Sequence, residues 1–263
     1  NTYLREFNPH VEAICLCSAD LLVTREVVER LVQCFLINRD VGMCGGRPEP
    51  TNGHGTFPGE ATRFLWHMHH RVAIEAPKLG ELIMVRAGIV KRLPQESAVD
   101  EASLEQMVVQ GGYRLAYVPE AVVHNHGPET VRDFFRQRRR IAAGHYWLRD
   151  VSGYAVSTMN VGRICRLTLG ELSLSNPRRT LYALGTIGAE VLSRGLGWLD
   201  FRTNRNKHTI WKVSETTKSV MTEEVRALYM QDLGTEDDPV SDSAVDLAVG
   251  SASKKLAERA TGT

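Results

Sequence analysis

A short apolar run near the start of the chain, followed at once by polar residues, constrains the fold more than any other feature. Residues 13–17 read Ala-Ile-Cys-Leu-Cys, and residues 18–20 read Ser-Ala-Asp. A continuous apolar run of this length is typical of a buried parallel strand that ends at a polar edge of its sheet. Thr24 can cap a following helix that ends near Asn38. A strand followed by a helix is the repeating unit of an α/β sheet, so the sequence predicts an α/β fold.

Further strands and helices are predicted up to about residue 150. The density of Gly, Pro and Asn from 42 to 59 predicts an irregular loop. The other predicted elements are a helix through Phe64 and Val72, a strand at 82–85, a helix at 100–110, strands at 113–118 and 121–123 joined by a turn at Pro119 and Glu120, and a helix at 129–144.

Composition narrows the class of protein. The 263 residues are 43% hydrophobic, which is enough to bury a core. Because Lys and Arg total 32 against 31 Asp and Glu, no overall basic field favours nucleic acid. Five cysteines, an odd number placed in apolar runs, indicate reduced, buried thiols and a cytoplasmic location. No apolar run reaches the roughly 18 residues that a membrane span needs, so none is predicted.

The carboxyl-terminal third contains a second amphipathic region. Apolar residues between Arg178 and Phe201 recur at helical spacing, with arginines beside them. Such a helix could lie at a membrane surface or could pack on the α/β domain or a partner. Beyond about residue 222 low apolar density predicts a mostly disordered tail. The predicted divisions are therefore 1–150, a helical extension at 151–220, and the tail at 221–263.

Four stretches, in the right order, make the chain resemble family 2 glycosyltransferases. Their residues are 18–20, similar to a D-x-D motif with Ser18 in place of the first acid; 100–104, similar to the acidic motif that supplies the catalytic base; 112–121, similar to the glycine, strand and Pro-Glu-Ala turn that follow it; and 137–141, similar to Q-x-x-R-W with Ile141 in place of Trp. The resemblance implies a GT-A fold, a mixed Rossmann-like sheet with flanking helices.

The first residues suggest where in such a domain the chain begins. Residues 1–5 resemble the segment just after the family's G-K-x-x-A-x-N element. If that alignment holds, the upstream strands that hold the nucleotide are not part of this chain. The resemblance therefore implies a GT-A domain without its amino-terminal strands, extended by carboxyl-terminal helices.

The resemblance also implies a divalent metal site. Asp20 is the candidate carboxylate ligand, and His124 occupies the position of a family histidine ligand, with His126 as the alternative. Carboxylate oxygens bind Mg²⁺ and Mn²⁺, and imidazole suits Mn²⁺ better. The expected cofactor is Mn²⁺ or Mg²⁺. A solvated loop aspartate and two turn histidines are the structural alternatives.

Paired acids at the start of the helix at 100–110 are the candidate catalytic base. Asp100 and Glu101 raise each other's pKa if partly buried, as a general base requires. The count to Leu104 favours Glu101, whereas chemical identity with the family aspartate favours Asp100. Acids in a helix's first turn are also stabilised by its dipole without any catalysis, which is the structural alternative.

Arginines on the helix at 129–144 are candidate substrate ligands, because their forked side chains bind phosphate oxygens. The resemblance places Gln137 and Arg140 at the diphosphate or acceptor, and Arg139 is a further candidate. The loss of Trp at Ile141 weakens the case for a processive polysaccharide synthase.

The predicted function is inverting transfer of a sugar from a nucleotide diphosphate sugar to the hydroxyl of a glycan or lipid-linked acceptor, as in cell-envelope polysaccharide synthesis. Peripheral contact with the inner face of the membrane would bring such an acceptor close. A non-catalytic binding module on the same truncated fold is the alternative, and Ser18 counts in its favour. A glycoside hydrolase is disfavoured because adjacent acids on one helix turn cannot flank a glycosidic bond.

Overall fold

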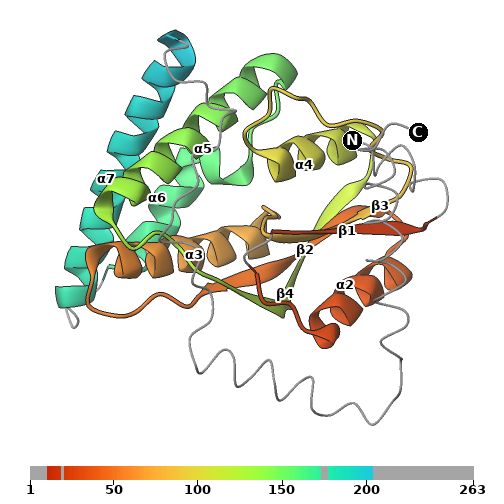
Figure 1. Ribbon diagram of the computed structural model, residues 1–263, viewed down its shortest axis with the longest axis horizontal. Coiled ribbons are helices and arrows are strands. Elements are labelled where there is room, and N and C mark those ends of the chain that lie inside the picture. Colours follow the sequence, from red (N-terminus) through yellow and green to blue (C-terminus); the bar gives the residue numbers. More distant parts are fainter. Residues whose placement is uncertain (1–10, 19–20, 173–176, 204–263) are drawn as a thin grey trace, which may run out of the picture. The chain divides into compact units, whose positions relative to one another are not determined.

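The structure is a computed structural model that describes residues 11–18, 21–172 and 177–203. Within these ranges the sheet has the order β1 (Ala13–Cys17), β3 (Leu82–Arg86), β2 (Val41–Pro50) and β4 (Arg114–Asn125). The helices, shown with the sheet in Figure 1, are α2 (Arg25–Ile37), α3 (Phe57–Glu75), α4 (Asp100–Gln110), α5 (Val131–Ser152), η2 (Ser157–Met159), α6 (Val161–Leu169) and α7 (Pro177–Thr203).

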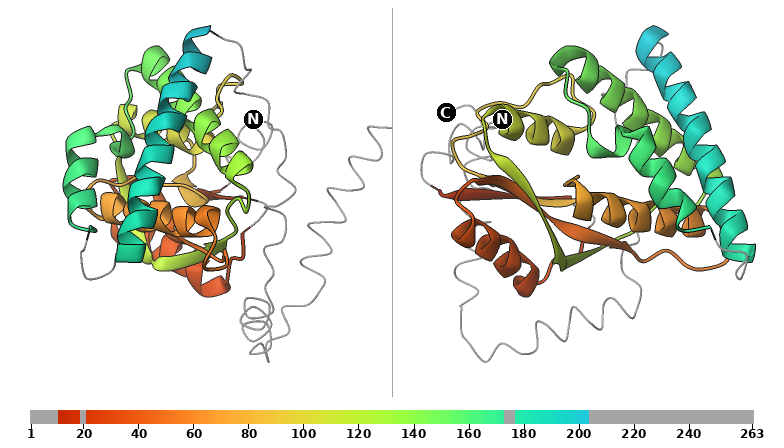
Figure 2. Two further views of the ribbon diagram at one scale, coloured as in Figure 1. Left: turned by 90° about the vertical axis from the view of Figure 1, so that its left-hand side faces the viewer. Right: turned by 180° about the vertical axis from the view of Figure 1, so that it is seen from behind.

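Helices cover both faces of the sheet, as the two views of Figure 2 show. On one face α2 packs its buried residues Val27, Leu31 and Phe35 against strand residues such as Met84 and Val123. On the other face Met43, Ile83 and Val85 pack against Leu104 and Val108 of α4. The mixed α/β sheet with flanking helices confirms the predicted fold class.

Strand β1 has the predicted bounds but not the predicted direction. It pairs with β3 in an antiparallel register from Ala13↔Arg86 to Cys17↔Leu82, so the expectation of a buried parallel strand is wrong. Ile14 is the one buried residue of the strand, and the side chains of Cys15 and Cys17 are exposed. An apolar run shows that a segment is extended, but it carries no information about the direction of its neighbour.

The predicted loop at 42–59 is also wrong over its first part, because residues 41–50 form β2. This strand pairs antiparallel with β3 and parallel with β4. Its glycines permit close approach rather than a turn. A Cβ at Gly42 would lie 2.6 Å from the Cβ of Tyr113, and one at Gly46 would lie 2.5 Å from the carbonyl oxygen of Ala121. Larger residues would push the neighbouring strand and helix away.

Strand β4 runs without a break through the turn predicted at Pro119 and Glu120. Its register with β2 shifts between the pair Gly45↔Tyr117 and the pair Arg47↔Val122. A proline cannot donate to a strand ladder, and a register irregularity is where a sheet tolerates it. The two predicted strands are therefore the two halves of one irregular strand.

Helix α7 packs along α5, and ion pairs join the two. Arg138 forms two 2.8 Å hydrogen bonds to Glu190, and Arg139 pairs with Asp200. Burial opposes ionisation of the Glu190 carboxyl, but Arg138 and then Arg194 outweigh it and lower its pKa to about 2. Because α5 continues to Ser152, the predicted division at 150 falls inside a helix.

The predicted tail at 221–263 lies outside the described residues. Among the helices of the described ranges, none combines the length and apolar character needed to cross a bilayer.

Candidate active site

A cleft of about 2250 Å³ opens on the side of the sheet that carries α3 to α5. Polar residues of its lining come from segments far apart in the sequence. They are Ser18 just after β1, Glu81 before β3, Glu101 on α4, residues 125–128 at and just after the end of β4, and Gln137 and Arg140 on α5. Apolar residues of the lining come mainly from α3, α5, α6 and α7. The cleft therefore combines polar side chains with a large apolar surface.

The start of α4 places one of the two candidate acids in this cleft. Glu101 lines the cleft, whereas Asp100 is exposed and is not among the lining residues. Partial burial, and next the charge of Glu101, raise the pKa of the Asp100 carboxyl. Arg140 reaches the same point from α5 and donates to the carbonyl oxygen of Ala98 at 3.0 Å. The two acids and one arginine therefore meet where α4 begins.

Local contacts fix this starting point of α4. The Ser97 hydroxyl accepts from the Val99 amide at 3.1 Å and lies 2.8 Å from the Ser103 hydroxyl. On α5, Gly144 leaves room for Val99, since a Cβ there would lie 2.9 Å from a Val99 methyl carbon. The close packing of α5 against the first turn of α4 sets the position of Glu101.

Glu105, one turn after Glu101, holds α4 to the loop before β3. Its side chain is 0% exposed. One carboxylate oxygen accepts from the Leu79 amide at 2.6 Å and from Lys78 Nζ at 3.2 Å, and the other accepts from the Tyr154 hydroxyl at 3.2 Å. Burial raises the pKa of the Glu105 carboxyl, against the opposing effect of Lys78. Sequence reasoning missed this residue, because its spacing fits an ordinary helical acid.

Glu81 stands in the same loop with an unusual backbone. Its φ is 62°, a left-handed conformation that costs residues with a Cβ of the order of 1 kcal/mol or more. Its carbonyl oxygen accepts from the Ser18 amide at 3.0 Å, so the strained residue joins the end of β1 to the loop. Strained residues of this kind concentrate at functional sites. From the sequence alone, the role of Glu81 was unassigned.

Replacement of Glu81 by glycine is expected to raise the free energy of unfolding by about 0.5–1 kcal/mol, because glycine adopts a positive φ without steric cost. The same variant should lose activity if the carboxylate acts in the cleft. Urea unfolding and turnover of Glu81→Gly are compared with those of Glu81→Ala, which removes the carboxylate but keeps the strain. A glycine variant less stable than the alanine variant would contradict the assignment of strain.

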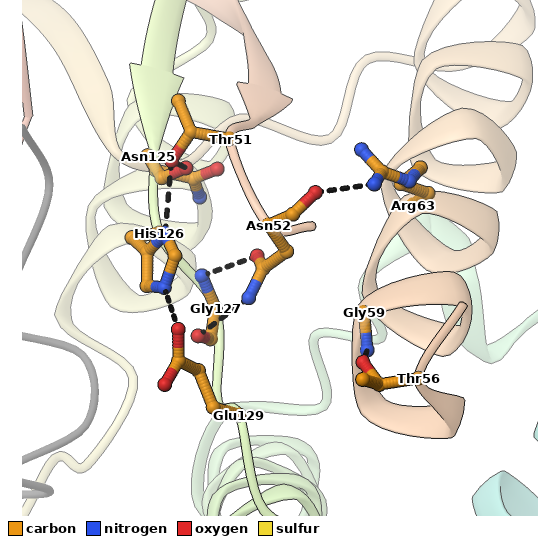
Figure 3. A network of polar contacts seen from close by, with 9 residues as sticks. All are labelled: Thr51, Asn52, Thr56, Gly59, Arg63, Asn125, His126, Gly127 and Glu129. Carbon is orange, nitrogen blue, oxygen red and sulfur yellow. Dashed lines mark hydrogen bonds and ion pairs between the residues drawn. The ribbon is translucent and has the colours of Figure 1, made fainter. Parts of the chain in front are cut away.

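The segment after β4 is held rigidly against the end of β2, as Figure 3 shows. The Nδ1 atom of His126 lies 2.9 Å from the Thr51 hydroxyl, and its Nε2 atom lies 2.9 Å from a Glu129 oxygen. Both ring nitrogens are therefore engaged within the protein. His126 could bind a metal only by giving up one of these contacts, which disfavours it as the alternative ligand.

Asn52 and Gly127 are joined by two hydrogen bonds in the same network (Figure 3). The side-chain amide nitrogen of Asn52 donates to the Gly127 carbonyl oxygen at 2.9 Å. The backbone amide of Gly127 donates to the side-chain oxygen of Asn52 at 2.8 Å. A Cβ at Gly127 would lie 2.5 Å from the Thr62 methyl group. This wall of the cleft is therefore preorganised and leaves no room for a larger residue.

Three buried polar atoms of the cleft have no hydrogen-bond partner among the described residues. They are the Asn125 side-chain oxygen, the Thr62 hydroxyl oxygen and the Nδ1 atom of His69. An unsatisfied buried polar atom costs about 1–3 kcal/mol, and a ligand that supplies its partner recovers this cost. All three residues are candidate ligand contacts. The sequence contained no signal for Thr62. At Asn125 the sequence motif favoured the neighbouring His124 and His126 as ligands instead.

The predicted metal ligands are not brought together within the described ranges. Asp20 lies outside them, although Ser18, Leu21 and Leu22 line the cleft. The His124 carbonyl oxygen accepts from the Leu22 amide at 3.2 Å, but His124 is not among the cleft-lining residues. No group of three His, Cys, Asp or Glu residues within 11–18, 21–172 and 177–203 could hold a metal ion. These residues alone do not form a metal site.

The three candidates on α5 have different surroundings. Gln137 is exposed at the cleft. Arg140 is half-buried, and burial lowers its pKa while Glu101 and Asp100 act in the opposite direction. Arg139 also borders the cleft, but its guanidinium is paired with Asp200 on α7. Gln137 and Arg140 are therefore better placed than Arg139 to meet a substrate.

Comparison with known proteins identifies the family. A family model described as "Glycosyl transferase family group 2" matches residues 3–192. The chain belongs to this family. Family membership confirms the predicted resemblance, which implied the GT-A fold. A search of curated proteins returned no match.

Among solved structures, this glycosyltransferase chain is similar to the mannosyltransferase PcManGT from Pyrobaculum calidifontis, solved in complex with GDP-Man and Mn²⁺. The TM-score is 0.43 and the sequence identity 17%, and the match covers 88% of this chain. It covers 65% of the mannosyltransferase chain, so this chain spans less than two thirds of that length.

Three of the four stretches that resemble family motifs reach one cleft in this glycosyltransferase chain. Ser18 represents the first, Glu101 the second, and Gln137 with Arg140 the fourth. The third stretch, at 112–121, lies mostly within β4 and carries the chain to the cleft wall at Asn125. Segments more than a hundred residues apart in the sequence thus converge on a single site.

Proposed function

We propose that this chain carries the catalytic residues of a glycosyltransferase that moves a sugar from a nucleotide diphosphate sugar to an acceptor hydroxyl, with inversion at the anomeric carbon. The observation that carries the proposal is the position of Glu101. In a chain of this family it faces a cleft whose other polar walls come from β1 and α5. Each of these walls contains a stretch that resembles a family motif.

In this reaction Glu101 accepts the proton of the acceptor hydroxyl as the acceptor oxygen bonds to the anomeric carbon. The bond from that carbon to the diphosphate oxygen breaks, and the diphosphate leaves with the electron pair. Arg140 and Gln137 of α5 line the same cleft, where a guanidinium fork and an amide can bind phosphate oxygens or the acceptor. One base and one in-line displacement invert the configuration.

Asp20, with His124, is the proposed ligand set for Mn²⁺ or Mg²⁺. When bound, the cation supplies positive charge that stabilises the leaving diphosphate. Support comes from the sequence motif and from the neighbouring residues Ser18, Leu21 and Leu22, which line the cleft. The described residues do not complete this site, so a binding experiment decides the assignment.

GDP or UDP with Mn²⁺ is expected to raise the melting temperature of the chain, because a ligand at about 100 times its Kd stabilises a protein by about 2.7 kcal/mol. Without ligand, Asp20→Asn should melt at the same temperature as the unchanged protein. With nucleotide and Mn²⁺ present, it should lose the Mn²⁺-dependent part of the shift in melting temperature. Differential scanning fluorimetry with each nucleotide, with and without Mn²⁺ or Mg²⁺, provides the measurement. An equal shift in Asp20→Asn would refute the metal assignment.

The apolar part of the cleft lining favours an acceptor with an apolar tail. It includes Phe64 and Met68 of α3, Ile164 of α6 and Ile187 of α7. A wholly polar glycan would leave these side chains without suitable contacts, whereas the tail of a lipid-linked acceptor would bury them. A lipid-linked acceptor for a cell-envelope glycan, met at the cytoplasmic face of a membrane, is the proposed substrate class.

A non-catalytic module is the second candidate, because Ser18 stands where the family motif has its first acid. The transferase and the non-catalytic module differ in whether they turn over a nucleotide sugar. Release of nucleoside diphosphate from a panel of nucleotide sugars supports the transferase. Nucleotide binding without any turnover across the same panel supports the module.

A further inference from the structure

Helix α7 has an unusual distribution of side chains. Its inner face, which packs on α5 and α3, consists of small or polar residues. The buried members are Ala183, Thr186, Ala189, Ser193, Gly197 and Asp200. At Gly197 an added Cβ would lie 2.7 Å from the Ala142 Cβ, so small size is required there. The core side of α7 is therefore the less apolar side.

Six large apolar residues of α7 lie exposed on the opposite face, which we call the outer face. It consists of Leu181, Leu184, Val191, Leu192, Trp198 and Leu199, whose exposed fractions range from 47% to 71%. These positions repeat mainly at steps of three, four and seven residues, which places them on one side of a helix. The right-hand view in Figure 2 shows α7 at the edge of the helical layer, beside α5. Exposed apolar patches of this kind mark interaction surfaces.

Charge distinguishes between possible partners of the outer face. The two acids of α7, Glu190 and Asp200, both point inward to arginines of α5. Exposed arginines stand near the two ends of the helix, where Arg178 lies over the Tyr182 ring and Arg202 over the Trp198 ring. The outer face is thus apolar along its length, basic at its ends and free of acids. This pattern is complementary to an anionic lipid surface.

We propose that the outer face of α7 lies in the headgroup region of a membrane that contains anionic lipid, with the helix parallel to the membrane plane. Apolar side chains enter the acyl boundary, Trp198 lies at the polar interface, and the two terminal arginines meet lipid phosphates. Since α7 also contributes Ile187 and Val191 to the cleft, this orientation brings the apolar part of the cleft close to the lipid. The proposal does not depend on transfer activity.

The test is vesicle binding by the complete chain. Sedimentation is measured with vesicles of phosphatidylcholine alone and with vesicles of equal parts phosphatidylcholine and phosphatidylglycerol. The test variant is Leu181→Glu with Leu199→Glu, two residues of the outer face that do not line the cleft. The matched control is Leu36→Glu with Ile74→Glu, which changes two exposed apolar residues of α2 and α3.

The unchanged protein is expected to bind the anionic vesicles, and added salt should weaken this binding. The α7 variant should bind about tenfold or more weakly, because two apolar side chains no longer leave water and two negative charges face the lipid phosphates. The control should bind like the unchanged protein. Circular dichroism and melting temperature check that both variants fold.

Several results would overturn the proposal. They are no vesicle binding by the unchanged protein, equal binding by the α7 variant, or equal binding to the two vesicle types at low salt. Analytical ultracentrifugation adds a further one. If the unchanged protein is a dimer and the α7 variant a monomer, the outer face binds a second copy of the chain instead of lipid.

Discussion

Replacement of Glu101 by glutamine is expected to lower the turnover number about 10²–10⁴-fold, because an amide cannot take the proton of the acceptor hydroxyl. The substitution preserves size, and Glu101 is only partly buried, so the fold should be unaffected. Nucleotide affinity should also stay close to that of the unchanged protein. The measurement is nucleoside diphosphate release at saturating nucleotide sugar and acceptor.

Asp100→Asn is the matched control for Glu101→Gln. Asp100 is adjacent to Glu101 in the sequence and also has a carboxyl side chain, but it is exposed and does not line the cleft. Loss of the Asp100 carboxylate should lower the turnover number far less, because it changes only the charge near Glu101. A large loss in Asp100→Asn with near-normal turnover in Glu101→Gln would transfer the base assignment to Asp100.

Replacement of Glu105 by alanine is expected to lower the free energy of unfolding by about 3–5 kcal/mol, because it leaves a buried ammonium without its counter-charge. Lys78 would lose its carboxylate, and the Leu79 amide and the Tyr154 hydroxyl would lose their acceptor. Urea unfolding at neutral pH measures the loss. Since Glu105 ties the loop before β3 to α4, turnover should fall as well.

A double variant separates the charge from the packing at this site. Lys78→Met combined with Glu105→Ala removes both charges, so it should be more stable than Glu105→Ala alone. Lys78→Met alone should also be destabilised, because the Glu105 carboxylate then remains buried. Losses that simply add in the double variant would show that Lys78 and Glu105 do not act as a pair.

Sequence periodicity predicted elements well where one physical signal dominated. The helix at 100–110 has its predicted bounds, because acids in its first turn and the glycines that follow it agree about where it begins and ends. The strand at 13–17 was found because its apolar run is bounded by polar residues. Strand β2 was missed because its glycines serve close packing, and single-sequence reasoning attributes glycine to turns.

The candidate site was predicted unevenly for a similar reason. Glu101, Gln137 and Arg140 were identified through stretches that resemble a family, and the structure places all three at one cleft. Glu105 and Thr62 were not identified, because burial of a polar residue depends on tertiary contacts that leave no periodic pattern. The division between the two faces of α7 was equally hidden, since the apolar spacing identifies a stripe but not which way it points.

The parallel pairing of β2 with β4 has a consequence for how the chain folds. The hydrogen-bonded residues Thr51 and Asn125 are 74 residues apart, and α3, β3 and α4 lie between them in the sequence. Contacts of such large sequence separation form slowly, because closing the long loop costs entropy before the contacts contribute any stabilising free energy. During synthesis the pairing of β2 with β4 can form only after β4 has emerged, whereas β2 can pair with β3 earlier. The Thr51 to Gly127 wall is thus absent from any early intermediate, and ligand-binding competence should appear late in refolding.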